Sequence, residues 1–73
     1  MDFMQFRKRI GLKIKYYRSL KDMTQAYLAE LVSCDESYMS LIENGRTNIS
    51  LPMIYKITSA LGVTASKIFE IED

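Results

Sequence analysis

Histidine and tryptophan are absent from this 73-residue chain, and cysteine occurs once, at Cys34. Without histidine and with a single cysteine, the usual ligand sets of structural zinc cannot be assembled. The same shortage removes histidine-based catalytic groupings, and no glycine-rich phosphate loop is present. We therefore expect no metal, no cofactor, no small-molecule ligand and no enzymatic activity.

Long apolar runs are also missing, because no stretch approaches the roughly 20 apolar residues that span a bilayer. The first ten residues, MDFMQFRKRI, place an acid before the basic cluster and lack the cleavage pattern of a signal peptide. A lone cysteine fits a reducing compartment, with Cys34 expected as a small apolar side chain rather than a redox switch. We expect a single cytoplasmic domain over residues 1–73, without membrane contact and with a small core.

Positive charge is concentrated near the N-terminus. Residues 1–21 hold seven of the ten basic residues and one acid, whereas residues 22–73 hold three bases and eight acids. A formal net charge of +1 argues against a general nucleic-acid coat protein. Attraction to phosphate would have to come mainly from the first helix and from Arg46. A solvated basic helix face is the alternative interpretation.

The spacing of apolar residues predicts an all-α fold, and the first helix begins after Asp2. Asp2 and Gln5 have the spacing of a capping box. Gly11 lies within this helix, where glycine costs about 1 kcal/mol relative to alanine, so we expect another helix to approach it closely. The buried stripe of the helix is predicted to be Phe6, Ile10, Ile14 and Tyr17.

Residues 24–45, TQAYLAELVSCDESYMSLIENG, predict two short helices with a tight break between them. Thr24 and Asp35 are the expected N-caps and Gly45 the end, which gives helices at about 25–32 and 35–44. Two helices joined so closely have the geometry of a helix-turn-helix, whose second helix can enter the DNA major groove, although an ordinary helical hairpin remains open. The expected apolar faces are Ala26, Leu28, Ala29, Leu31 and Val32, then Met39 and Ile42.

Two further helices are predicted towards the C-terminus. Ser50 caps the fourth, with Pro52 in its first turn, and Gly62 closes it. Thr64 caps a short fifth helix that runs to about residue 69, with Ile68 facing inward. The buried stripe of the fourth helix is predicted to be Leu51, Ile54, Ile57 and Leu61.

Beyond this spacing, the residues closely resemble the phage repressor and Cro (Xre-like) helix-turn-helix family, over almost the whole chain. The resemblance implies a compact five-helix, lambda-repressor-like domain. It departs at Ser33, where the family often has glycine, and a left-handed serine there costs about 1 kcal/mol. The matching residues are Thr24, Gln25, Leu28, Ala29, Glu30, Ser37, Tyr38, Ile42, Glu43, Asn44, Gly45, Arg46 and Thr47, with Ile10, Gly11, Ile14, Arg18 and residues 60–63 outside them.

The resemblance also implies roles for individual residues. Arg18 is expected to pair with Glu43, and Gln25 to brace the recognition helix and touch the DNA backbone. Side chains that point outward from the third helix are expected to read bases, with a glutamate accepting from cytosine and a leucine covering a thymine methyl. The predicted base readers are Glu36, Ser37, Ser40 and Leu41. The predicted DNA-backbone contacts are Gln25, Tyr38, Asn44, Arg46, Thr47 and Asn48.

The acids Asp35 and Glu36 count against DNA binding, because they would face a polyanion. At a helix N-terminus each gains about 0.3–1 kcal/mol from the helix dipole without any DNA. We nevertheless predict a DNA-binding transcriptional regulator, a repressor or controller that acts as a homodimer on a palindromic operator. An antitoxin and a protein-interaction module that has lost DNA binding are the alternatives. The predicted dimer contacts are Tyr55, Phe69 and Ile71, from an apolar group that also includes Ile49 and Met53.

Overall fold

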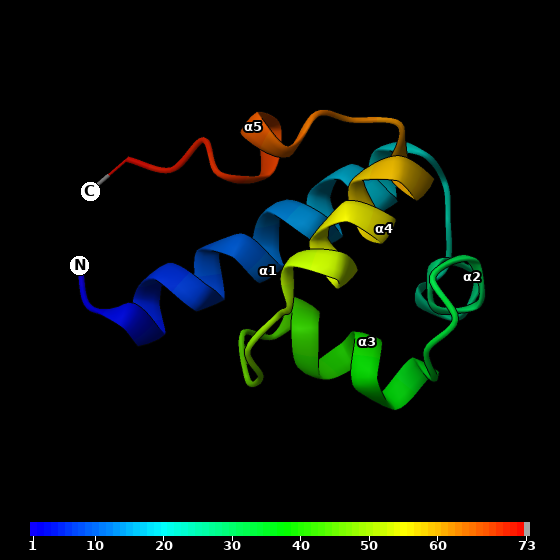
Figure 1. The fold of residues 1–73 in the computed structure, drawn as a ribbon, viewed down its shortest axis with the longest axis horizontal. Helices are drawn as coiled ribbons and strands as arrows, with labels where there is room; N and C mark the ends of the chain where they lie inside the picture. The colour runs from blue at the N-terminus through cyan, green and yellow to red at the C-terminus, as the bar shows by residue number, and fades with distance from the viewer. Residues whose placement is uncertain (73) are drawn as a thin grey trace.

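The computed structural model describes residues 1–72 and contains five helices and no strand in that range (Figure 1). The longest helix, α1, lies along the molecule and packs against α3, α4 and α5, while α2 closes one end against α3 and α4. The all-α prediction is therefore confirmed. The helices are α1 (Phe3–Leu20), α2 (Gln25–Leu31), α3 (Glu36–Glu43), α4 (Leu51–Leu61) and α5 (Ala65–Ile68).

Side-chain caps define where most of these helices begin. Asp2 and Gln5 form the predicted capping box, with reciprocal bonds of 2.8 and 3.0 Å between each side chain and the other's backbone N–H. Thr24, Asp35 and Ser50 each accept a bond from the backbone N–H three residues later. Thr64 precedes α5 but makes no cap bond, because its hydroxyl pairs with Ser66 instead.

The core is a single apolar cluster to which every helix contributes. Three predicted core residues are wrong: Ala26, Leu31 and Leu51 are exposed, Leu51 by 80%. The seven-residue α2 buries only one narrow face, and Leu51 sits at the first position of α4, on the rim of a shallow apolar depression of about 150 Å³. The buried apolar residues are Ile10, Ile14, Leu28, Ala29, Val32, Met39, Ile42, Ile54, Ile57, Leu61 and Ile68.

Gly11 is where α1 and α3 touch through their main chains. A Cβ atom at this position would lie 2.5 Å from the carbonyl oxygens of both Ile42 and Glu43. No side chain fits there, which confirms the predicted close approach and accounts for a glycine in mid-helix. The contact fixes the last turn of α3 against α1.

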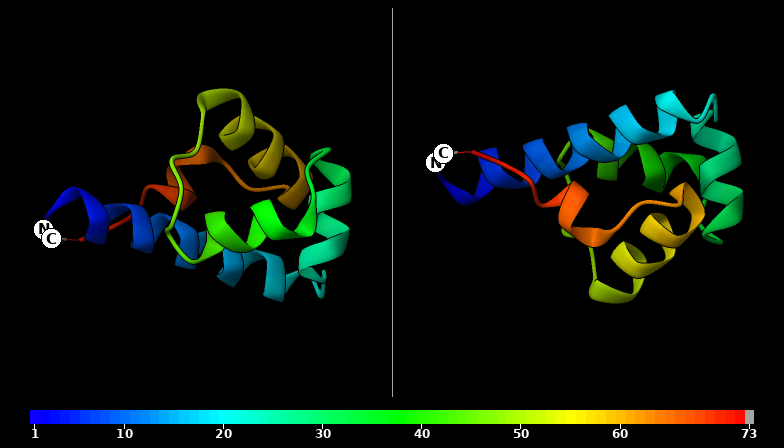
Figure 2. Two further views of the ribbon diagram at one scale, coloured as in Figure 1. Left: turned by 90° about the horizontal axis from the view of Figure 1, so that it is seen from below. Right: turned by 90° about the horizontal axis from the view of Figure 1, so that it is seen from above.

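The C-terminal segment returns along α1, so that both ends of the described chain lie at the same end of the molecule (Figure 2). The rings of Phe6 and Phe69 stack with their centroids 6.4 Å apart. The Arg9 guanidinium donates to the carbonyl of Glu72 at 2.8 Å. None of the helices in residues 1–72 is long and apolar enough to cross a membrane.

Candidate nucleic-acid interface

The turn between α2 and α3 is four residues long and contains one left-handed residue. Ser33 has φ 61°, as expected from its place in the family pattern, and the next residue donates its backbone N–H to Ala29 at 2.9 Å. Asp22, in the preceding connection, also has a positive φ of 55°, which sequence reasoning did not anticipate. The tight turn sets α3 across the end of α2.

The outer face of α3 holds the four predicted base readers. Glu36 and Ser37 are exposed, Leu41 is 42% exposed and Ser40 is half-buried. The opposite face is anchored by Met39 and Ile42, which are completely buried. One side of the helix is therefore fixed in the core while the other presents a short polar and apolar ridge.

Asp35, the acid just before this ridge, caps the N-terminus of α3. The Asp35 carboxylate accepts from the backbone N–H of Tyr38 at 2.7 Å, as an N-cap does. Tyr38 itself is half-buried and packs against the core. Of the two neighbouring acids, only Glu36 is left with an exposed side chain that is free of a capping bond.

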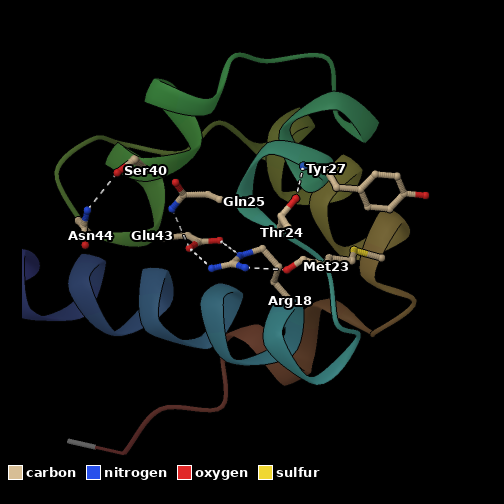
Figure 3. A network of polar contacts seen from close by, with 8 residues as sticks. All are labelled: Arg18, Met23, Thr24, Gln25, Tyr27, Ser40, Glu43 and Asn44. Carbon is tan, nitrogen blue, oxygen red and sulfur yellow. Dashed lines mark hydrogen bonds and ion pairs between the residues drawn. The ribbon is translucent and has the colours of Figure 1, made fainter.

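A polar network holds the last turn of α3 to α1 and α2 (Figure 3). Arg18 grips Glu43 through two bonds, Nε to Oε2 at 2.7 Å and Nη2 to Oε1 at 3.1 Å, and its Nη1 donates to the Met23 carbonyl. Gln25 donates to Glu43 Oε1 at 3.1 Å from the first position of α2. The Glu43 side chain is only 1% exposed, and its carboxylate is fully paired, which such burial demands.

The loop after α3 brings together the remaining predicted backbone contacts. Asn44, Arg46 and Asn48 are exposed, and Thr47 is half-buried. The Asn44 amide donates to the Ser40 hydroxyl at 3.3 Å (Figure 3). These polar and charged side chains follow the end of the ridge in the chain and have the chemistry that binds phosphate oxygens.

Comparison with known protein families matches residues 14–68 to a model described as helix-turn-helix. The match spans the network, the turn, α3 and the following loop. The chain belongs to this helix-turn-helix family. Membership confirms the resemblance, the fold class and the expectation of a regulator rather than an enzyme.

Similar proteins include regulators of known sequence and structure. The control protein C.MunI from Mycoplasma sp. is 42% identical over 62 residues, which cover 84% of each chain. The restriction-modification controller protein C.AhdI from Aeromonas hydrophila has a TM-score of 0.82 at 32% identity, over 85% of this chain and 94% of its own. The biofilm regulator SinR, solved in complex with DNA, has a TM-score of 0.74 at 37% identity, over 81% and 95%.

The predicted dimer residues of this helix-turn-helix domain lie on α4 and on the segment that follows α5. Tyr55 is 74% exposed on the outer side of α4, beside Leu31 and Ala60. Phe69 lies near Leu51, which is one turn before Tyr55 on α4. Ile71 is half-buried and lines an open groove along α1, which Phe69 also lines. Phe69 therefore adjoins both Leu51 and Ile71, whereas Tyr55 lies one turn beyond Leu51 on α4.

Sequence reasoning missed Arg7 in this helix-turn-helix domain. Its Nε donates to the Gly45 carbonyl and its Nη1 to Asn48 Oδ1, both at 2.9 Å. In the sequence Arg7 is one of seven basic residues within residues 1–21, and helical periodicity says nothing about a loop 38 residues away. The one signal available was its position one turn before Gly11, on the side of α1 that meets the end of α3.

Cys34 lies in the turn of the helix-turn-helix, half-buried against the core. Burial raises the pKa of its thiol, and the neighbouring Asp35 carboxylate raises this pKa further. A raised pKa keeps the group as an uncharged thiol near neutral pH, which suits a small packing residue.

Proposed function

We propose that this chain is a cytoplasmic, sequence-specific DNA-binding transcriptional regulator, a repressor or controller. The observation that supports this best is the two-sided character of α3. Its inner face is held by the core and its last turn by the bond from Arg18 to Glu43, while Glu36, Ser37 and Leu41 remain exposed. A helix fixed in this way can present a constant set of side chains to a major groove.

In this proposal the ridge contacts the bases, and the residues around it contact the DNA backbone. Glu36 accepts from a cytosine amino group, Leu41 covers a thymine methyl, and Ser37 and Ser40 bond to base edges. The DNA backbone is contacted from the two ends of the ridge, which sets the register without encoding sequence. These backbone contacts are Gln25, Tyr38, Asn44, Arg46, Thr47 and Asn48.

We further propose that two copies bind a palindromic operator. One short ridge reads only a few base pairs, whereas two copies related by a twofold axis read half-sites about one helical turn apart. The contact between copies uses Tyr55 and Phe69, together with the exposed Leu51 between them. Ile71, the third predicted contact, lines the groove along α1 together with Phe69.

A binding titration over a range of salt concentrations tests the proposal. Selection from a random duplex pool should recover a palindromic sequence, and binding to it should be stronger than to a scrambled duplex and should weaken steeply with salt. No enrichment, together with no binding in dilute buffer, would refute the proposed function.

The acids at the start of α3 favour a second candidate, a protein-interaction module. Asp35 is used as a cap, so the argument rests on Glu36 alone, which lies exposed where DNA would approach. The titration also separates the two candidates, because an interaction module would fail to bind any duplex at low salt. An antitoxin would bind both its operator and a toxin.

A further inference from the structure

Arg7, on α1, is hydrogen-bonded to the loop that follows the recognition helix. The loop residues 44–48 have no secondary structure of their own to hold them, apart from turn bonds at their start. Arg7 supplies two hydrogen bonds to this loop, at Gly45 and at Asn48, and its guanidinium lies 5.5 Å from the centre of the Phe3 ring. Two hydrogen bonds from α1 thus hold the loop, while the contact with Phe3, on the same helix, helps to hold the guanidinium.

The charge of Arg7 is not neutralised by these contacts. Its two acceptors, a backbone carbonyl and an amide oxygen, are both uncharged. Arg18 differs, because the Glu43 carboxylate cancels its charge. In residues 1–72, Arg7 forms no ion pair, and its Nη2 group makes no hydrogen bond. A full positive charge therefore lies against the loop, at Gly45 and Asn48, and the exposed Arg46 follows Gly45 in the chain.

The bond from Arg7 also determines what Asn48 offers to solvent. An amide side chain has one accepting oxygen and one donating NH2 group. Because Oδ1 of Asn48 accepts from Arg7, the NH2 group is left to donate, and it has no partner within the described residues. A donor backed by positive charge suits a phosphate oxygen and not a base amino group.

We propose that Arg7 and Asn48 together form a binding site for one phosphate of the DNA backbone, with Arg7 both orienting the Asn48 amide and supplying the charge. This inference rests on the proposed function and adds a residue of α1 to the interface. Arg7 is a positioning residue for Asn48 and an electrostatic partner of the phosphate. It also gives part of the basic N-terminal segment a specific task.

Substitutions at Arg7, measured with the duplex recovered by selection, test the assignment. Arg7→Ala should weaken binding about tenfold and lower the slope of log affinity against log salt by about one. Arg7→Lys should keep the slope but lose part of the affinity, because lysine keeps the charge without the two-pronged bond. Asn48→Ala should cost clearly less in an Arg7→Ala background than in the wild type.

Arg9→Ala is the matched control. Arg9 is on the same helix and loses the same charge, but its bond is to Glu72, away from the loop. Binding and salt slope should stay close to wild type for this variant, and circular dichroism should show that all variants are folded. An unchanged slope for Arg7→Ala, or the same loss for Arg9→Ala, would overturn the assignment of Arg7 while leaving the DNA-binding function in place. A wild-type chain that binds no duplex would overturn both.

Discussion

Ser33 holds the backbone conformation that the helix-turn-helix bend requires, although it is not glycine. With φ at 61°, its Cβ atom is crowded by the backbone, and the side chain is exposed and makes no hydrogen bond that offsets this strain among the described contacts. The turn therefore forms with serine in place of glycine, and the strain at this one residue lowers the stability of the fold.

Ser33→Gly should raise the free energy of unfolding by about 0.5–1 kcal/mol, because glycine accepts a positive φ without strain. Urea denaturation followed by circular dichroism measures the difference. Ser59→Gly is the matched control, since Ser59 is exposed within α4, and it should lower stability by about the same amount. A Ser33→Gly variant that is less stable than the wild type would show that interactions of the serine outweigh its backbone strain.

Glu36→Gln addresses specificity at the residue scale. A carboxylate only accepts hydrogen bonds, whereas an amide also donates, so the base preferred at one operator position should change more than the overall affinity. Selection from the same random duplex pool with both proteins measures this. An identical preference for the two proteins would remove Glu36 from the base readers.

At the scale of elements, α3 is joined to α1 by more than apolar packing. Gly11 brings the two main chains together, and Arg18 binds the last residue of α3. The pair is nearly inaccessible, with 12% of the Arg18 side chain and 1% of the Glu43 side chain exposed. A buried charge that loses its partner is more costly than the loss of the whole pair.

Glu43→Ala should therefore destabilise the fold by about 3–5 kcal/mol, since it leaves Arg18 buried without a counter-charge. The double variant Arg18→Met/Glu43→Leu should recover much of that loss, because both charges are replaced by apolar side chains of similar volume. Urea unfolding of the single and double variants provides the comparison. A double variant less stable than Glu43→Ala would show that the pair itself stabilises the domain.

The sequence predicted these elements better than their orientation. The caps at Asp2, Asp35 and Ser50 and the close approach at Gly11 follow from local chemistry, which the sequence displays directly. The outward position of Leu51 does not, because it depends on where α4 begins relative to its neighbours.

The candidate site shows the same limit. The four side chains of the ridge follow from helical spacing, and the partners of Glu43 follow from a family resemblance. The bonds from Arg7 to the loop could not be predicted, since they join positions 38 and 41 residues apart through irregular backbone. Periodicity has no information on such pairs.

At the scale of the whole molecule, apolar side chains remain on the surface beyond what one copy can cover. Leu51 and Tyr55 project from adjacent turns of α4, and Phe69 lies close to the first of them. Aromatic and leucine side chains that are exposed together are typical of a contact with another protein. This surface is the place where the proposed homodimer is tested.

Tyr55→Glu should shift the chain from dimer to monomer in sedimentation at micromolar concentration, because it places a charge in the contact between copies without disturbing the core. Leu20→Glu is the control, since Leu20 is 60% exposed and is not among the predicted contacts. A wild-type protein that sediments as a monomer would refute the dimer.

The main-chain contact at Gly11 limits how far the protein can adjust its shape to a DNA duplex. At Gly11 the main chains of α1 and α3 meet without a side chain between them, so a change of rotamer at this contact cannot tilt the reading ridge or slide it outward. The orientation of α3 relative to α1 is therefore fixed. Any adjustment between different operators must then be made by bending and twisting of the DNA, and sequences that deform easily would gain affinity at positions that no side chain touches.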